Sequence, residues 1–414
     1  DLRLIYALVD VKEATAMANE KQGRITPEIS KAIIQACREI KTGQFDDQFV
    51  TEAIQGGAGT SINMNVNEVV AARASEILGE KVSDLDHVNA SQSTNDSVPT
   101  AIKITTLQLI KNCIQELDLL QKTFTQKSEE FNDIIKVGRT HFQDAVPVSL
   151  GQEFAAYASL CSRGKKRLEY LLNGELLCLN LGGTAIGTSI GTNKDFSEVV
   201  ISALAQITGF SLKKSQNLID ATQNVDIFVD VSARLKAIFC GLSKISNDIR
   251  KMASGPRAGL WEISLPERQK GSSIMPGKVN PVIPEYINQI YFQIFGNDVT
   301  ITEAAGQGEF ELNVMLPVLS FNLIESLSLT AKGLKVFREF CIEGITANKE
   351  RCQELLDQSF CTVTALNKHI GYYEAVKVAK EAFESGKTVR EIVLQKKLLS
   401  EDQADEVLDP GKLI

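Results

Sequence analysis

The sequence predicts a predominantly α-helical protein, an all-α fold, with a central bundle of long helices. The main observation is an unbroken series of apolar residues whose spacings alternate between four and three: Val231, Leu235, Ile238, Leu242, Ile245, Ile249 and Met252. Such a series is typical of a long helix with one narrow packing face. The second observation is that alternating apolar and polar strand patterns bounded by turns are scarce.

A second long helix is predicted after Pro99-Thr100, because proline is favoured at the first position of a helix. Its apolar series skips only Gln121 and consists of Leu107, Ile110, Ile114, Leu117 and Phe124. Further helical patterns lie near residues 10–42, 64–78, 149–173, 194–208, 282–296 and 312–340. A packing face that continues along a whole helix can pair helices of different subunits as readily as helices of one chain, so the pattern is compatible with an oligomer.

The composition is that of an ordinary globular protein. With 414 residues, of which 43% are apolar and 23% charged, the chain can bury a large core and is long enough for two or three domains. The net charge of -8 argues against a general attraction to nucleic acid or to anionic membranes. An acidic ligand would therefore have to be held by local positive groups, for which Lys278 and Arg139 are candidates.

Eight cysteines are scattered through the chain without any C-x-x-C pair, which argues against a zinc site and against a dense disulfide scaffold. We expect reduced, mostly buried thiols. No run of eighteen apolar residues and no charged-then-apolar leader occurs, so neither a membrane span nor a signal peptide is indicated, and the cytoplasm is the expected compartment. The chain begins at Asp1 rather than at Met, and we expect natural N-terminal sequence to precede it.

The segment Gly271–Pro281 has the composition of a functional loop. It combines two serines, Lys278 and Asn280 with chain-bending glycine and proline, as a loop that closes over an anionic substrate requires. A phosphate-binding Walker A loop is the nearest alternative, but that motif has four residues between its glycines and a hydroxyl residue after the lysine. Here five residues intervene and Val279 follows, while an ordinary turn does not require these polar groups together.

Three other polar segments interrupt the helical pattern, Gly56–Asn63, Ser91–Asp96 and Gly138–Asp144, and each is expected at a helix boundary. Taken singly, each can be explained by capping, since Ser, Thr, Asn and Asp favour N-caps and turns. Four segments of similar chemistry in one helical chain favour a shared site. His141 lies beside Thr140, which makes a role in binding or proton transfer credible. No metal-ligand spacing and no G-x-G-x-x-G pattern occurs, so neither a metal nor a dinucleotide site is predicted.

These motifs resemble those of the fumarase/aspartase superfamily. Gly271–Pro281 resembles its signature, and Ser91–Asp96 and Gly138–Asp144 resemble its other two active-site segments in the expected order. Within the superfamily the chain most resembles the aspartate ammonia-lyase branch, on the basis of Ser93-Thr94-Asn95, of Pro281–Glu285 with Asn288-Gln289, and of Asp220–Asn224. Class II fumarate hydratase is the alternative, because both enzymes bind fumarate. A catalytically silent, crystallin-like structural homologue is the alternative of another class.

The resemblance implies three domains, at residues 1–92, 93–347 and 348–414, and a homotetramer whose active sites each draw segments from three subunits. It implies a small-molecule substrate, L-aspartate or fumarate, with no nucleic acid and no membrane as partner. No cofactor is required, and activation by a divalent cation cannot be read from the sequence. The link Gly79–Asp86 is short compared with relatives that carry an accessory anion site there, so no accessory site is expected.

The resemblance also assigns roles to individual residues. Ser272 resembles the general base that removes a proton from the carbon next to a carboxylate, and Lys278, Asn280 and Thr140 resemble groups that stabilise the resulting aci-carboxylate. Glu285 matches the partner that orients and charges His141, a position at which some aspartases carry Gln. The groups that hold the other carboxylate and the amine are matched by Thr60, Ser93, Thr94, Asn95 and Ser273.

Overall fold

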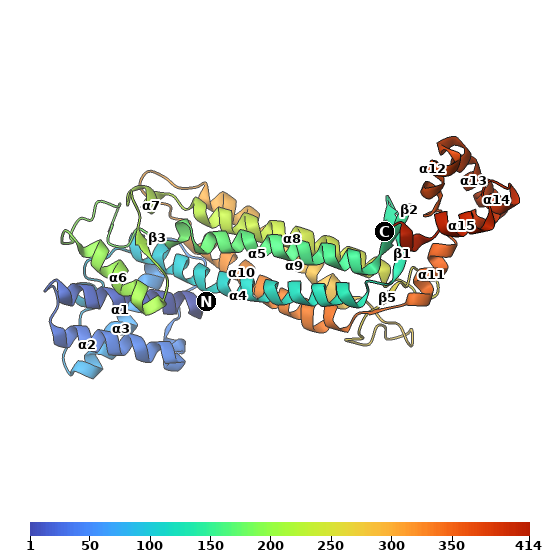
Figure 1. Ribbon diagram of the computed structural model, residues 1–414. Coiled ribbons are helices and arrows are strands. Elements are labelled where there is room, and N and C mark those ends of the chain that lie inside the picture. The colour runs from blue at the N-terminus through green and yellow to red at the C-terminus, as the bar shows by residue number, and fades with distance from the viewer. The chain divides into compact units, whose positions relative to one another are not determined.

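The computed structural model describes residues 1–414 (Figure 1). The chain forms two compact units. Unit 1 consists of Asp1–Glu116, Gly164–Cys240 and Gln289–Lys332, and unit 2 of Leu117–Arg163, Gly241–Asn288 and Gly333–Ile414. The unit boundaries fall inside long helices, so each unit takes part of them. The three-domain division expected from the resemblance is a different partition of the chain and stays a prediction.

Five long helices dominate the chain and confirm the predicted all-α class: α4 (Thr94–Glu130), α5 (Leu150–Leu172), α8 (Asp226–Met252), α9 (Val282–Ala305) and α10 (Leu316–Phe340). All seven residues of the predicted series in α8 are buried, with at most 4% of their surface exposed. Within unit 1, Ser232 of α8 bonds to Asp298 of α9, and Asn297 of α9 bonds to Ser326 of α10. Side-chain hydrogen bonds therefore join α8 to α9 and α9 to α10 within unit 1.

The start of α4 differs from the prediction, because the helix begins at Thr94 and Pro99 lies inside it. A proline in this position leaves the carbonyl of Asn95 without its helical N–H partner. The Nδ2 group of Asn180 donates to that carbonyl at 3.0 Å and replaces the missing bond. In addition, Ser93 Oγ accepts the N–H of Asn95 and Asp96 accepts the N–H of Ser93, a reciprocal capping arrangement that the Ser-x-x-Asp spacing signals in the sequence.

The N-terminal part of unit 1 contains α1 (Leu2–Lys21), α2 (Pro27–Glu39) and α3 (Thr60–Leu78) (Figure 1). The helical pattern predicted at 10–42 is thus broken between α1 and α2, where Gly23 has φ +70° and Thr26 caps α2. Unit 1 also contains α6 (Phe196–Thr208), α7 (Asp220–Gln223) and a short parallel pair of strands, β3 (Cys178–Leu179) and β4 (Lys213–Lys214).

Unit 2 contains a β-hairpin that the sequence analysis did not anticipate. Strands β1 (Ile135–Thr140) and β2 (Gln143–Ser149) pair antiparallel, and His141 and Phe142 form the two-residue turn with φ +55° and +62°. Positive φ at both turn residues is the geometry that matches the twist of a tight hairpin. The segment Gly138–Asp144 therefore lies on a hairpin, and the expectation that it lies at a helix boundary was wrong.

Unit 2 also contains a small helical region at the C-terminal end of the chain. Strands β5 (Ile263–Ser264) and β6 (Thr346–Ala347) pair antiparallel. Strand β6 is followed by α11 (Lys349–Asp357), α12 (Asn367–Ile370), α13 (Tyr372–Ser385), α14 (Val389–Gln395) and α15 (Glu401–Val407). These last helices have an apolar core of their own, formed by Leu366, Ala375, Val378, Ala382, Val389, Ile392, Val393, Ala404 and Leu408.

All eight cysteines are unpaired, and six of them are buried, as the sequence analysis expected. Burial raises the pKa of the Cys113 thiol to about 12. Buried thiols of this kind are inert. None of the helices combines the length and the apolar character needed to cross a lipid bilayer.

The core of unit 2 is centred on Phe124 of α4, which is completely buried. Its ring centroid lies 6.1 Å from that of Phe154, 5.7 Å from that of Tyr157 and 6.3 Å from that of Phe337. We expect Phe124→Ala to lower the free energy of unfolding by about 3–5 kcal/mol, because it removes a buried ring and leaves a cavity. Urea unfolding would measure the change.

The matched control is Phe383→Ala, because the Phe383 side chain is 76% exposed. This substitution should change the free energy of unfolding by less than about 0.5 kcal/mol. Equal losses in the two variants would show that Phe124 has no special place in the core.

Candidate functional site

The residues expected to form the site are divided between the two units. Unit 1 holds Thr60, Ser93, Thr94 and Asn95, whereas unit 2 holds Thr140, His141, Ser272, Ser273, Lys278, Asn280 and Glu285. The resemblance implied that segments from several subunits combine in one site.

In unit 1, Ser93, Thr94 and Asn95 form the N-terminal end of α4 and are half-buried. The N-terminus of a helix carries unpaired N–H groups and the positive end of the helix dipole, which suits a carboxylate ligand. Asn95 Nδ2 donates to the carbonyl of Ala185 at 2.7 Å, which ties the segment to the glycine-containing loop that follows β3. The backbone position of the segment is therefore fixed from both sides.

The side chain of Asp96 holds this segment in place. Its carboxylate is completely buried and accepts three backbone N–H groups at 3.0 Å, from Ser93, Gly182 and Thr184. Burial raises the pKa of Asp96 to about 6, although the N–H bonds and Lys12 oppose the shift. Asp96 belongs to the Ser91–Asp96 motif, but its residue type alone did not predict this supporting role.

Lys12 is a further buried group that the sequence analysis missed. Its ammonium group donates to Asn63 Oδ1 at 2.7 Å, to Gln92 Oε1 at 2.9 Å and to Asn89 Oδ1 at 3.2 Å. Burial lowers the pKa of Lys12 to about 7, and the charge of Asp96 opposes this effect. Because Asn63 Nδ2 also reaches Thr94 Oγ1 at 3.4 Å, the network lies directly under the segment. The only signal in the sequence is a lysine within the largely apolar stretch Ala7–Ala18.

Thr60 begins α3 after Gly57 and Gly59, whose φ values are +85° and +91°. Its hydroxyl donates to the carbonyl of Gly57 at 2.7 Å, and its side chain is exposed. A Cβ on Gly59 would lie 3.1 Å from Val98 Cγ1, so the turn before Thr60 requires glycine both for conformation and for space.

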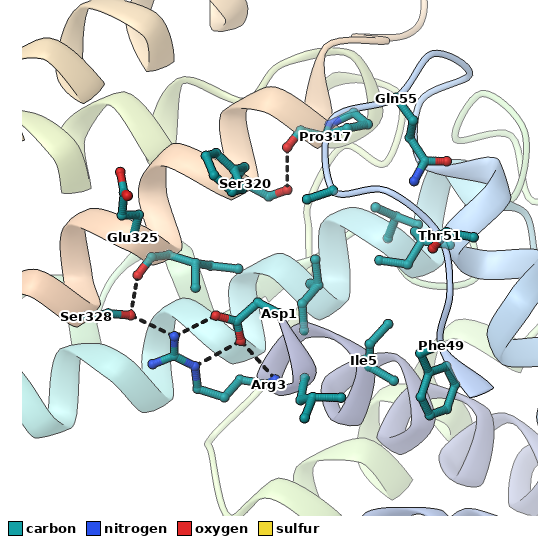
Figure 2. A pocket seen from close by; sticks show the side chains of 18 residues that line it. Asp1, Arg3, Ile5, Phe49, Thr51, Gln55, Pro317, Ser320, Glu325 and Ser328 are labelled. Atoms are coloured by element: carbon teal, nitrogen blue, oxygen red, sulfur yellow. Dashed lines mark hydrogen bonds and ion pairs between the residues drawn. The ribbon is translucent and has the colours of Figure 1, made fainter. Parts of the chain in front are cut away.

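A cavity of about 560 Å³ also lies in unit 1 (Figure 2). Arg3 at its edge donates to Asp1 at 2.6 Å and to Ser328 at 2.7 Å, while much of the lining is apolar, with Ile5 and Phe49 among its residues. None of the expected site residues lines this cavity. It is therefore not the candidate site.

In unit 2, Thr140 and His141 occupy the exposed tip of the β1–β2 hairpin. The next residue, Phe142, is held by a cation–π contact, in which the ammonium group of Lys251 lies 4.3 Å from the ring centroid. The side chain of His141 makes no hydrogen bond within the chain. Its imidazole is therefore free to bind a ligand or to exchange a proton.

The loop Gly271–Pro281 presents Ser272 in a specific electrostatic setting. Ser272 Oγ accepts the N–H of Ile274 at 3.2 Å and the N–H of Met275 at 3.1 Å. Hydrogen bonds to the ionised form of a group favour that form. These two donors are the kind of group that stabilises a serine alkoxide.

The same loop closes upon itself at Gly271. A Cβ at this position would lie 1.8 Å from the carbonyl oxygen of Lys278, so only glycine allows the approach. Asn280 Nδ2 donates to the carbonyl of Gly271 at 2.6 Å and closes the loop from the other end. The side chains of Ser273 and Lys278 are exposed on it.

Two expected interactions are not found within the chain. Glu285 lies in the first turn of α9 with Arg250 Nη2 at 3.9 Å, and no hydrogen bond or ion pair joins it to His141. Arg139, a candidate for holding an acidic ligand, instead donates to the buried carboxylate of Glu262 at 2.7 Å. Because its charge is already paired within the chain, Arg139 is a weaker candidate than Lys278 for holding an acidic ligand.

The chain belongs to the fumarase/aspartase superfamily of lyases. A lyase family model matches residues 3–296, and a model of the fumarase C C-terminus matches residues 363–414. An aspartate ammonia-lyase from a Bacillus species is 49% identical over 99% of this chain and 89% of the relative. Another from Bacillus subtilis (strain 168) is 48% identical over 99% of this chain and 87% of the relative.

Solved structures agree with this membership. A class II fumarase from Schistosoma mansoni superposes with a TM-score of 0.95 at 36% identity, covering 99% of this chain and 90% of that chain. A fumarate lyase:delta crystallin from Brucella melitensis, bound to cobalt, gives 0.95 at 44% identity with the same coverage. The predicted family and helical architecture are confirmed, and the protein is an enzyme of the lyase class.

The pKa of Asp96 gives a testable pH dependence. Its pKa in the folded protein, about 6, is above the usual value of 3.8, so the folded state binds this proton more tightly. The stabilising contribution is complete below pH 3.8 and is lost as the pH rises through 6. Since one pKa unit corresponds to about 1.4 kcal/mol, the change is about 3 kcal/mol.

We therefore expect the difference in unfolding free energy between the wild-type protein and Asp96→Asn to change by about 2 kcal/mol between pH 4 and pH 6, the larger part of the full change. Urea unfolding at four pH values would measure it. A difference that is independent of pH would mean that Asp96 titrates normally.

Proposed function

We propose that the protein is an aspartate ammonia-lyase, a carbon–nitrogen lyase that reversibly eliminates ammonia from L-aspartate and gives fumarate. The observation that carries the proposal is the pair of backbone N–H groups directed at Ser272 Oγ. The relatives named aspartate ammonia-lyase, at 43–49% identity over nearly the whole chain, support the choice of reaction.

In the proposed mechanism, ionised Ser272 removes the proton from the carbon next to the substrate carboxylate. The two electrons of that bond move into the carboxylate and form an aci-carboxylate with additional negative charge. Lys278, Asn280 and Thr140 stabilise this charge, and such preorganised donors usually contribute most to the lowering of the barrier. The electrons then return to form the carbon–carbon double bond of fumarate as ammonia leaves.

The other end of the substrate is bound by the hydroxyl and amide groups. Ser93, Thr94 and Asn95 at the positive end of α4 hold the second carboxylate, with Thr60 and Ser273 completing the contacts to the carboxylate and the amine. Because no contact within the chain joins His141 to Glu285, the proposed pairing, in which Glu285 orients the imidazole, forms between different subunits. The reaction as written needs no cofactor, and turnover with and without EDTA, and with added Mg²⁺, would test this.

The proposed active form is a cytoplasmic homotetramer in which each site combines segments of three subunits. The division of the expected site residues between the two units supports this, because a shared site needs segments on separate parts of the chain. Phe292, Phe295 and Val299 recur on one face of α9 and are 64%, 49% and 51% exposed, and a row of exposed apolar residues is typical of a contact surface. Sedimentation analysis would give the oligomeric state.

The reaction is tested by following fumarate absorbance with L-aspartate and with L-malate as separate substrates. Faster turnover of L-aspartate supports the proposal. Faster turnover of L-malate would identify the protein as a fumarate hydratase. The similarity to the Schistosoma mansoni class II fumarase is the observation behind this alternative. Absence of activity with all dicarboxylate and amino-acid substrates would favour a structural role.

Ser272→Ala gives the sharpest test of the mechanism. We expect turnover to fall by about 10²–10⁴-fold while binding of a non-reacting dicarboxylate changes little, because the hydroxyl acts mainly in the transition state. Lys278→Ala should weaken both turnover and binding, since its charge contacts the ground state and the transition state alike. Turnover and dicarboxylate binding are measured for both variants. Near-normal turnover in Ser272→Ala would remove this residue from the mechanism.

A further inference from the structure

Four charged side chains form a cluster at the base of the β1–β2 hairpin, entirely within unit 2, and two of them are fully buried. Glu262 Oε1 lies 2.7 Å from Arg139 Nη1, and Glu262 Oε2 lies 3.2 Å from Lys136 Nζ. Lys136 Nζ also lies 3.1 Å from Glu153 Oε2. The side chains of Glu262 and Lys136 are 0% and 2% exposed. Two cations and two carboxylates make the cluster neutral.

Stability alone is a poor explanation for this cluster. Removing charges from water costs several kcal/mol per ion, and well-packed apolar residues of similar size are often equally stable or more stable. What a buried ion pair supplies is a defined geometry, because each charge has a low energy only next to its partner. The two ends of the cluster therefore indicate which segments of the chain it holds in a fixed geometry.

One end of the cluster is fixed to the helical framework of unit 2. The N–H of Glu262 donates to the carbonyl of Met252 at the end of α8, at 2.8 Å. The carbonyl of Glu262 accepts the N–H of Asn348, just before α11, at 2.9 Å. Glu262 directly precedes β5 and stands ten residues before Ser272 on the segment that leads into the Ser272 loop.

The other end holds the hairpin tip. The register of β1 and β2 shifts between Val137 and Arg139, and a Cβ on Gly138 would lie 2.4 Å from the carbonyl oxygen of Val146. A bulge of this kind redirects the strand beyond it. Arg139 is the first residue after the irregularity and the last before Thr140, so its bond to Glu262 determines where the tip points.

We propose that Glu262 is a positioning residue, whose buried carboxylate holds Arg139 and Lys136 and thereby fixes the hairpin tip with Thr140 and His141 relative to the start of the Ser272 loop. The kinetic part of this inference rests on the proposed function, in which Thr140 stabilises the reaction intermediate. A displacement of about 1 Å in such a group can lower the rate about 100-fold.

The chain offers a matched pair of variants. Glu262→Gln and Glu153→Gln each neutralise one carboxylate of the same cluster and keep its shape, but only Glu262 contacts Arg139. We expect Glu262→Gln to lower kcat about 10–100-fold with a smaller change in KM, and Glu153→Gln to keep kcat within about threefold. Unfolding midpoints should fall in both variants. Equal losses of kcat would overturn the proposal, because they would show a general effect of charge balance, and normal kcat in Glu262→Gln would overturn it directly.

A double-mutant cycle with Arg139→Gln tests the specific bond. If Arg139 and Glu262 act together, the double variant loses no more kcat than the more impaired single variant. Additive losses would overturn the proposal. If Glu262→Gln does not fold, Arg139→Lys provides the test, since it keeps the charge and removes the planar fork. It should reduce kcat at least 10-fold, and normal kcat would count against the proposal.

Trp261 provides a readout that does not depend on activity. It is the single tryptophan of the chain, it directly precedes Glu262, and it is 38% exposed. Its emission and its quenching by acrylamide should change in Glu262→Gln and stay as in the wild type in Glu153→Gln. If the wild-type protein is inactive with aspartate and malate, the proposed function fails. The comparison of Trp261 fluorescence between the two variants still tests the positioning role in that case. Unchanged emission and quenching in Glu262→Gln would overturn it.

Discussion

Two buried carboxylates, Asp96 and Glu262, impose the constraint on which the candidate site depends. A charge removed from water is tolerated only when hydrogen bonds or opposite charges replace the lost solvent. Asp96 accepts N–H groups from Ser93 and from the Gly182–Thr184 segment, and Glu262 binds the two cations of β1. Breaking a buried pair costs about 3–5 kcal/mol, so the polar segments above these carboxylates cannot shift without losing a large part of the folding free energy.

In this arrangement, the residues that hold the backbone in place differ from the residues expected to contact substrate. In unit 2, Thr140, His141 and Lys278 are exposed, whereas Glu262 is buried. In unit 1, Thr60 is exposed, whereas Lys12 and Asp96 are buried. Exposed hydroxyls and amines can exchange water for a ligand, while the buried charges keep the backbone in one conformation. Ser272 combines both properties, because its own loop supplies the two N–H groups that favour its ionised form.

The helices could be predicted because their signal is local. An apolar series with alternating four and three spacing, as in α8, has one low-energy solution, a helix with that face buried. Local rules failed where a distant partner intervenes. Pro99 would normally start a helix, but Asn180, eighty-one positions away, satisfies the carbonyl of Asn95 that the proline leaves unpaired, so α4 extends further towards the N-terminus. The sequence did not predict the β1–β2 hairpin, because its central residues have the composition of a polar turn.

The sequence by itself determined the helical class, the four polar segments and, through their resemblance to a lyase superfamily, the chemistry expected of Ser272, because residue type and spacing along the chain are sufficient for these. Only the tertiary structure decided that Arg139 is paired with Glu262 and that the Lys12 network lies under Thr94. It also decided that Ser272 Oγ accepts two backbone N–H groups. The physical reason is that a charge or a hydroxyl acquires its properties from burial and from partners, and these partners are brought together by packing between segments that are far apart in the chain.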